Sequence, residues 1–151
     1  MRLWRENYER SPYFQDVLKI LGNIGLGSTE TISDLNIELI YRICDYLNIS
    51  TPMMLSNELA LEGSKTARLI DLLKKLNAST YLSGPSADVY LDKDEFKRAG
   101  ISLEYKSYDY EPYPQQWGGF DGAVTVLDLI ANLGPVAQNY IRSHTADIQV
   151  V

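Results

Sequence analysis

Apolar residues recur every three or four positions in several parts of the chain, which is the spacing of an amphipathic helix. The predicted helices occupy residues 12–21, 33–47, 65–76, 92–99, 126–133 and 136–142, and another turn or two is expected within residues 1–10. We expect Ser33 to cap the second helix, with Ile32 and Ile37 as its hydrophobic staple. Asp92 and Glu95 form a capping box for the fourth.

Three stretches between these helices have strand character: residues 51–55, 80–83 and 101–105. Helices and strands therefore alternate, which is typical of parallel βαβ construction. The sequence predicts an α/β fold, a three-layer-like Rossmannoid with a small, mostly parallel sheet of three short strands and about six helices. We expect residues 23–30 to be a loop and the tail, residues 143–151, to be loose.

The stretch around residue 84 reads as a strand, a tight turn and a new helix in direct succession. The turn consists of Ser83, Gly84, Pro85 and Ser86, with Ser86 as the expected helix cap. In α/β sheets, ligands bind where the chain leaves the carboxyl end of a strand. The hydroxyls and N–H groups of this turn suit a phosphate or carboxylate. The alternative is a turn and cap with a structural role only.

Five aromatic residues are concentrated between positions 105 and 117 of a chain with eleven tyrosines. Flat aromatic faces pack against the apolar face of a sugar ring, while Gln and Asp side chains bond its hydroxyls. Tyr113 and Gln115 are the candidate ligand contacts in this segment. The alternative is a long loop that its aromatic side chains pin to the core. We predict a ligand pocket between this segment and the Ser83–Ser86 turn.

Asp128 and Asn132 lie four residues apart, and therefore on one face of a predicted helix. Both are candidate ligand contacts, although Asp128 is most simply interpreted as a capping acid for its own helix. The carboxylates between residues 88 and 95 match no calcium-loop spacing, so no metal site is predicted. His144 has no identifiable triad partners, and no catalytic residue or cofactor is assigned.

Composition and charge exclude several classes of function. A net charge of −6 argues against nucleic-acid binding, which needs a positive surface. No apolar run approaches the ~20 residues that cross a bilayer, so membrane insertion is not expected. The amino terminus lacks the apolar core of a signal peptide, which predicts a cytoplasmic protein. The single cysteine, Cys44, excludes an internal disulfide.

Several separated motifs extend over nearly the whole chain. They are Tyr8, Ser11-Pro12-Tyr13-Phe14, Leu35-Asn36, Leu39-Ile40, Tyr81-Leu82-Ser83-Gly84-Pro85-Ser86-Ala87, Tyr90-Leu91, Phe96, Ala99-Gly100-Ile101, Leu103-Glu104-Tyr105, Tyr113-Pro114-Gln115, Gly119-Phe120, Val126-Leu127-Asp128-Leu129, Asn132 and Gly134. Together these motifs resemble the WbqC-like family. The ligand-binding candidates that these motifs contain are Ser83, Gly84, Pro85, Ser86, Tyr90, Tyr113, Gln115, Asp128 and Asn132.

The resemblance implies a role in the synthesis of surface polysaccharides, such as the O-antigen of lipopolysaccharide. The implied partner is an activated sugar or a nucleotide. The implied reaction is the transfer of an acyl or aminoacyl group to the sugar. The alternative is a non-catalytic α/β module, or a truncated remnant, that binds a nucleotide, a sugar or a partner protein.

One family feature has no counterpart in this sequence. Family members begin with a strand and a His-Gln-Pro-Asn-type motif, whereas the only histidine here is His144. The resemblance therefore implies that residues 1–151 form a single α/β domain, the carboxyl-terminal part of a larger, truncated domain. Such a part would leave a sheet edge and an apolar face uncovered, which favours self-association.

Overall fold

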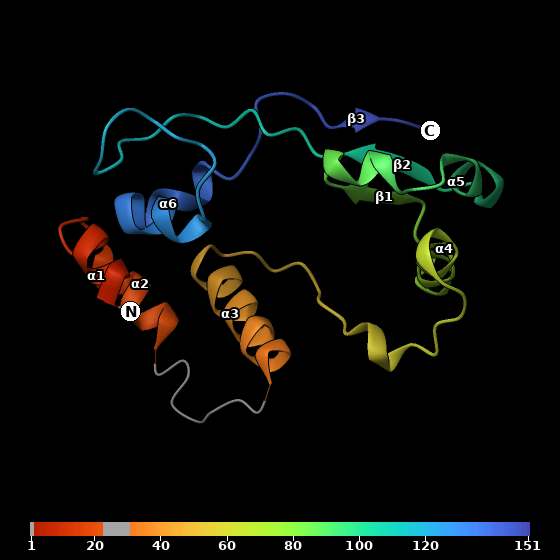
Figure 1. Cartoon of the computed structure of the whole chain (residues 1–151), viewed down its shortest axis with the longest axis horizontal. Coiled ribbons are helices and arrows are strands. Elements are labelled where there is room, and N and C mark those ends of the chain that lie inside the picture. The colour runs from red at the N-terminus through yellow and green to blue at the C-terminus, as the bar shows by residue number, and fades with distance from the viewer. Residues whose placement is uncertain (1, 23–30) are drawn as a thin grey trace. The chain divides into compact units, whose positions relative to one another are not determined.

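The computed structural model describes residues 2–22 and 31–151 (Figure 1). The chain forms two compact units, and each combines segments that are distant in sequence. Unit 1 consists of Met1–Thr51 and Tyr110–Arg142, and unit 2 consists of Pro52–Asp109 and Ser143–Val151. The predicted loop at residues 23–30 lies outside the described residues. The expectation of a single domain stays a prediction.

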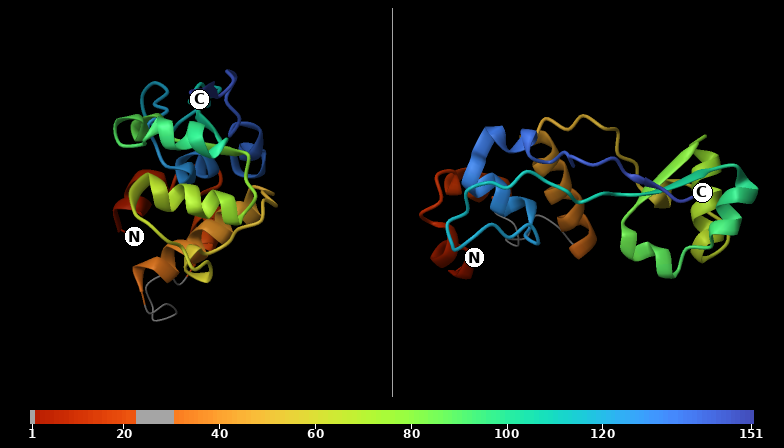
Figure 2. Two further views of the ribbon diagram at one scale, coloured as in Figure 1. Left: turned by 90° about the vertical axis from the view of Figure 1, so that its right-hand side faces the viewer. Right: turned by 90° about the horizontal axis from the view of Figure 1, so that it is seen from above.

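Unit 1 is built from helices. They are α1 (Arg2–Tyr8), α2 (Phe14–Leu21), α3 (Ile32–Tyr46), α6 (Val126–Leu133) and the 3₁₀ helix η3 (Gly134–Asn139). The predicted apolar stripes form its core, in which the side chains of Val17 and Ile130 are fully buried. Helix α2 packs against both α3 and α6, and Figure 2 shows these helices from two further directions. Segments from both ends of the sequence therefore share one core.

A close contact joins the start of α2 to the end of α6. The Tyr13 N–H donates to the Ala131 carbonyl oxygen at 2.9 Å. The Tyr13 ring lies against Gly134, whose φ of 56° is in the left-handed region. A Cβ at this position would come within 2.3 Å of the ring, so only glycine fits. Ser11, which precedes α2, does not cap this helix; its hydroxyl donates to Gln116 Oε1 at 2.9 Å.

Unit 2 contains the sheet. Its elements are η1 (Ser56–Glu58), α4 (Lys65–Lys75), β1 (Thr80–Ser83), η2 (Pro85–Val89), α5 (Lys93–Ala99), β2 (Ser102–Tyr105) and β3 (Ile148–Gln149). The strand order is β1-β2-β3. Strands β1 and β2 are parallel, with Ser83 opposite Tyr105, and β3 pairs with β2 in the antiparallel direction. Leu103, Phe96 and Leu73 bring β2, α5 and α4 into one core (Figure 1).

The predicted α/β class is confirmed, with about six helices and a three-stranded sheet, but the third strand differs from the prediction. Residues 51–55 are not in the sheet, and the tail that we expected to be loose contributes β3. The sheet is therefore mixed. Among residues 2–22 and 31–151, no helix has the length and apolar character needed to span a bilayer.

The helix caps divide into correct and incorrect predictions. The Asp92 carboxylate accepts hydrogen bonds from the first turn of α5, as expected. The Asp92 N–H, however, donates to Thr66 Oγ1 at 3.0 Å rather than to Glu95. Helix α3 is capped by Thr31, whose Oγ1 accepts from the Asp34 N–H at 3.1 Å. The predicted cap at Ser33 is therefore wrong. The predicted hydrophobic staple is also wrong, because Ile32 is 78% exposed.

Candidate ligand-binding site

The aromatic segment after β2 is anchored in unit 1 by Tyr113. Its ring is buried in the core, and its hydroxyl donates to Asp128 Oδ1 at 2.6 Å. A hydrogen bond of this length to a carboxylate is stronger than one between neutral groups. The segment is therefore pinned to the core, as the structural alternative expected, and Tyr113 is the residue that pins it.

Gln115 closes the loop that follows Tyr113. Its side-chain oxygen accepts from the Asp121 N–H at 2.8 Å, and its amide nitrogen donates to the Asp121 carbonyl at 2.9 Å. The same nitrogen lies 3.0 Å from Asp128 Oδ1 and 3.3 Å from the Tyr113 hydroxyl. Because an amide nitrogen has two hydrogens, these partners use its donor capacity. Gln115 therefore holds the loop and the buried carboxylate together.

Helix α6 supplies the polar centre of this arrangement. Its cap is Thr125, whose hydroxyl accepts from the Leu127 N–H, so the helix does not need Asp128 for that purpose. Asp128 is 5% exposed, and its carboxylate accepts from Tyr113 and Gln115 instead. The Asn132 amide donates to the Asp128 backbone oxygen at 2.8 Å. The two residues share a helix face, as predicted.

Burial and the Asp128 carboxylate keep the neighbouring phenols protonated. Burial first, and then Asp128, raises the pKa of Tyr8 to about 12. The same two causes raise the pKa of Tyr113 well above its usual value of 10, although the Gln115 amide opposes them. The hydroxyl of Tyr113 is therefore a hydrogen-bond donor to Asp128 at neutral pH.

An apolar hollow of about 190 Å³ lies beside this network, within unit 1. It is lined by Tyr110, Tyr113, Phe120, Gly122, Val124, Thr125, Val126, Leu129, Tyr140 and Ile141. The rings of Phe120 and Tyr140 meet the Tyr113 ring edge to face, at centroid distances of 5.2 and 6.3 Å. The hollow thus has aromatic walls, and the loop that Gln115 closes carries one of them.

The predicted turn after β1 lies in unit 2. The Ser83 carbonyl accepts from the Lys106 N–H at 2.8 Å, and η2 begins at Pro85 with Gly84 as its cap. Ser86 is exposed and lies inside η2, so its predicted role as the helix cap is wrong. Tyr90 follows η2 and is 69% exposed.

The structure therefore distributes the predicted site residues over the two units. Tyr113, Gln115, Asp128 and Asn132 come together in unit 1, by direct hydrogen bonds. The turn and Tyr90 belong to unit 2. The predicted pocket that joins the two groups stays a prediction.

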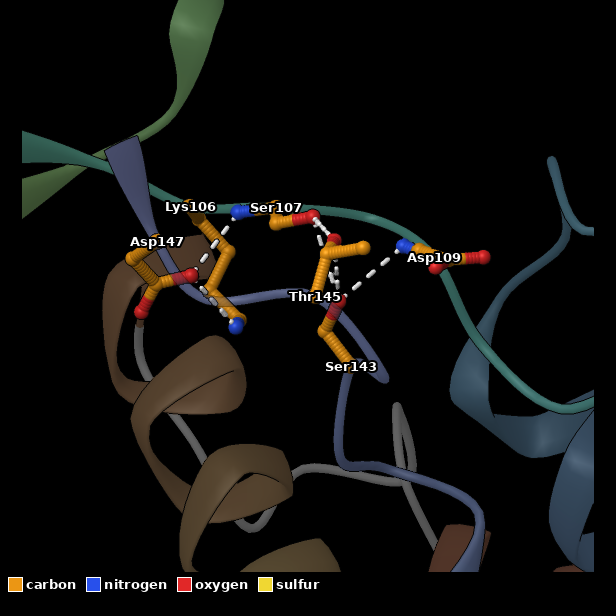
Figure 3. A network of polar contacts seen from close by, with 6 residues as sticks. All are labelled: Lys106, Ser107, Asp109, Ser143, Thr145 and Asp147. Atoms are coloured by element: carbon orange, nitrogen blue, oxygen red, sulfur yellow. Dashed lines mark hydrogen bonds and ion pairs between the residues drawn. The ribbon is translucent and has the colours of Figure 1, made fainter.

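Unit 2 has a polar network of its own, which connects the tail of the chain to the segment after β2 (Figure 3). Its members are Lys106, Ser107, Asp109, Ser143, Thr145 and Asp147. The Lys106 ammonium and the Ser107 N–H both donate to Asp147 Oδ1 at 2.8 Å. The hydroxyls of Ser107, Ser143 and Thr145 form hydrogen bonds with one another. The Ser143 hydroxyl also accepts from the Asp109 N–H. These contacts pair two crossing segments, so we interpret the network as structural.

Sequence reasoning missed part of the hollow's lining. Tyr140 and Ile141 follow η3 and reach the hollow only because α6 and η3 pack together. No local pattern distinguishes them from other apolar residues. Phe120 did have a signal, because the family-like Gly119-Phe120 motif contains it. Among the described residues, no group of three histidine, cysteine or acidic side chains is arranged to hold a metal ion.

Comparisons with known proteins agree with the resemblance of the motifs. The chain is 40% identical over 144 residues to a Mycobacterium tuberculosis (strain ATCC 25618 / H37Rv) protein named "Uncharacterized protein Rv1507c". The aligned part covers 92% of this chain and 62% of that relative, so the chain spans less than two thirds of the relative's length. No solved structure matches. The profile of the WbqC-like protein family matches residues 1–140, and the chain belongs to that family.

Proposed function

We propose that this chain binds an activated sugar in the synthesis of a surface polysaccharide, such as the O-antigen of lipopolysaccharide, and that the hollow in unit 1 receives the sugar. The observation that carries the proposal is the aromatic wall of Tyr113, Phe120 and Tyr140 around a hollow of about 190 Å³. Aromatic rings of this kind pack against the C–H face of a pyranose. Membership of the WbqC-like family supports the pathway.

The size of the hollow favours a sugar ring over a whole nucleotide sugar. Pockets that enclose drug-sized ligands measure ~300–1,000 Å³, and this one is smaller. On this proposal the nucleotide or phosphate part lies outside the hollow. The turn residues Ser83, Gly84, Pro85 and Ser86, with Tyr90, belong to unit 2 and stay separate candidate contacts for a phosphate or carboxylate.

The proposed reaction of the complete protein is the transfer of an acyl or aminoacyl group to the sugar, in the cytoplasm. A second function, a binding module without catalysis, is favoured by one observation. The polar groups beside the hollow, on Tyr113, Gln115 and Asp128, are hydrogen-bonded to one another. Turnover of an activated sugar by residues 1–151 alone would exclude the second function.

Isothermal titration with UDP-glucose, UDP-N-acetylglucosamine and UDP alone tests the proposal. We expect the sugar nucleotides to bind more tightly than UDP, and Phe120→Ala to weaken their binding about threefold to tenfold. Tyr41→Ala is the matched control, because Tyr41 is an equally exposed aromatic residue of unit 1 outside the lining. Binding equal to that of UDP, or equal losses in both variants, would contradict the proposal.

A further inference from the structure

We infer that the hollow of unit 1 selects sugars with a methyl-ended substituent, a 6-deoxy methyl or an N-acetyl group, over fully hydroxylated sugars. This inference rests on the proposed function and narrows its substrate class. It follows from the chemistry of the lining, from the polar atoms that the lining has already engaged, and from the exposed apolar residues at the hollow's rim.

The lining is mostly apolar, and its polar side-chain groups are the hydroxyls of Tyr110, Tyr113, Thr125 and Tyr140. Of the described residues that line it, none carries a charge, and five have hydrocarbon side chains: Phe120, Val124, Val126, Leu129 and Ile141. A pyranose with all its hydroxyls presents several polar groups, each of which needs a partner when it is buried. Hydrocarbon walls provide none.

Two of the polar atoms in the lining are already in use. The Tyr113 hydroxyl donates its hydrogen to Asp128 and is approached by the Gln115 amide. The Thr125 hydroxyl accepts from the Leu127 N–H as the cap of α6. A sugar hydroxyl that approaches Tyr113 must therefore compete with the bond to Asp128, whereas Thr125 still has its own hydrogen to donate.

The rim of the hollow carries apolar side chains that remain partly open. Phe120 is 41% exposed and Val124 is 38% exposed. Gln115 holds the loop that carries Phe120, because its side-chain amide bonds both the N–H and the carbonyl oxygen of Asp121. The rim is thus a positioned apolar surface that a methyl group would cover.

These features translate into a difference in affinity. Burying one methyl group contributes about a fourfold gain. Burying a hydroxyl without a partner costs about tenfold or more. We therefore expect a 6-deoxy sugar to bind at least about tenfold more tightly than its hydroxylated counterpart, and an N-acetyl sugar to do so when its methyl group is buried and its amide stays at the open rim.

Two pairs of ligands test the inference by isothermal titration of the 151-residue chain. UDP-N-acetylglucosamine and UDP-glucose differ at the C2 substituent. GDP-D-rhamnose and GDP-mannose differ only in the C6 hydroxyl. UDP and GDP alone give the baseline. A tenfold preference in the first pair supports the N-acetyl form of the inference, and a preference in the second supports the 6-deoxy form.

A matched pair of variants assigns the preference to the hollow. Val124→Thr adds a hydroxyl at the rim with little change of shape and is expected to reduce the preference to about threefold or less. Val136→Thr makes the same change at an exposed position of unit 1 outside the lining and is expected to leave it unchanged.

The outcomes separate this inference from the proposed function. Equal affinities within both pairs, with binding well above the nucleotide baseline, would overturn the inference and keep the proposed function. A preference for the hydroxylated sugars, or an equal effect of both variants, would also overturn it. Binding no tighter than the bare nucleotides would overturn both.

Discussion

The buried polar side chains of unit 1 and unit 2 serve different ends. In unit 2, Thr66 is buried and accepts from the Asp92 N–H, which completes the corner where α5 begins. In unit 1, Asp128 is equally buried, yet its carboxylate completes neither a helix cap nor a strand ladder. Its partners are Tyr113 and Gln115, which shape the wall and the loop of the hollow.

This difference shows where to look for function in a fold with few other signals. A buried carboxylate is costly unless it is hydrogen-bonded, so its presence requires a reason. Secondary structure supplies such a reason for Thr66 but not for Asp128. What Asp128 does is hold an aromatic ring and a loop at the edge of an apolar hollow. Unit 1 is therefore the better candidate for the ligand.

The largest expected effect is that of Asp128→Ala. The change leaves the Tyr113 hydroxyl and one Gln115 bond without their acceptor and opens a small cavity, at a cost of about 3–4 kcal/mol in the free energy of unfolding. Urea denaturation measures it. Glu58→Ala, which removes an exposed carboxylate of unit 2, is the control and is expected to cost little. Similar costs for the two variants would remove the contrast between the units.

Tyr113→Phe tests the same network more narrowly. It removes one hydroxyl and its hydrogen bond to the carboxylate while keeping the ring, so we expect a loss of about 2 kcal/mol. Measured again by urea denaturation, the double variant with Asp128→Ala should lose less than the sum of the single changes. Additive losses would mean that the two side chains act independently.

Asp92→Ala examines a polar residue whose role is local. The loss of the α5 cap is expected to cost about 1 kcal/mol in the free energy of unfolding, because two N–H groups lose their acceptor. Asp94→Ala removes a neighbouring carboxylate that caps nothing and should cost less than half as much. If thermal denaturation ranked Asp94→Ala above Asp92→Ala, the assigned cap would be wrong.

Features that depend on neighbours in sequence were predictable. The Asp92 cap and the end of α5 at Gly100, where φ is 68°, follow from local chemistry. Strand β3 was not predictable in this way. It is two residues long and exists because Ile148 and Gln149 pair with β2, more than forty residues away.

The candidate site was predictable in its members but not in its contacts. Tyr113, Gln115 and Asp128 were each predictable as candidates, but not as partners of one another. An acid three residues after a threonine has the same local pattern whether it caps its helix or faces inward, so Asp128 was open to both interpretations. Only the packing of α6 against α2 and the aromatic segment decides between them.

Tyr8 in unit 1 is expected to lose its contribution to stability at alkaline pH. The pKa of Tyr8 is raised from 10 in the unfolded chain to about 12 in the folded state. Its contribution is therefore complete below pH 10 and is lost as the pH rises toward 12. The absorbance of tyrosinate should show this late titration, and Tyr8→Phe should remove it. Ionisation of all tyrosines near pH 10 would contradict the assignment.

Asp147 in unit 2 is expected to lose its contribution to stability at acid pH, with the smallest expected effect. The hydrogen bonds from Lys106 and then from the Ser107 N–H lower the pKa of this carboxyl below its usual value of 3.8. Because the folded-state pKa is the lower one, the stabilisation is complete above pH 3.8 and is lost as the pH falls through the folded-state value. Hydrogen-exchange protection at β3, corrected for the intrinsic exchange rate at each pH, should therefore fall in acid before protection in α6 does. Asp147→Asn should remove this pH dependence, whereas acid opening of α6 before β3 would place the weak point in unit 1.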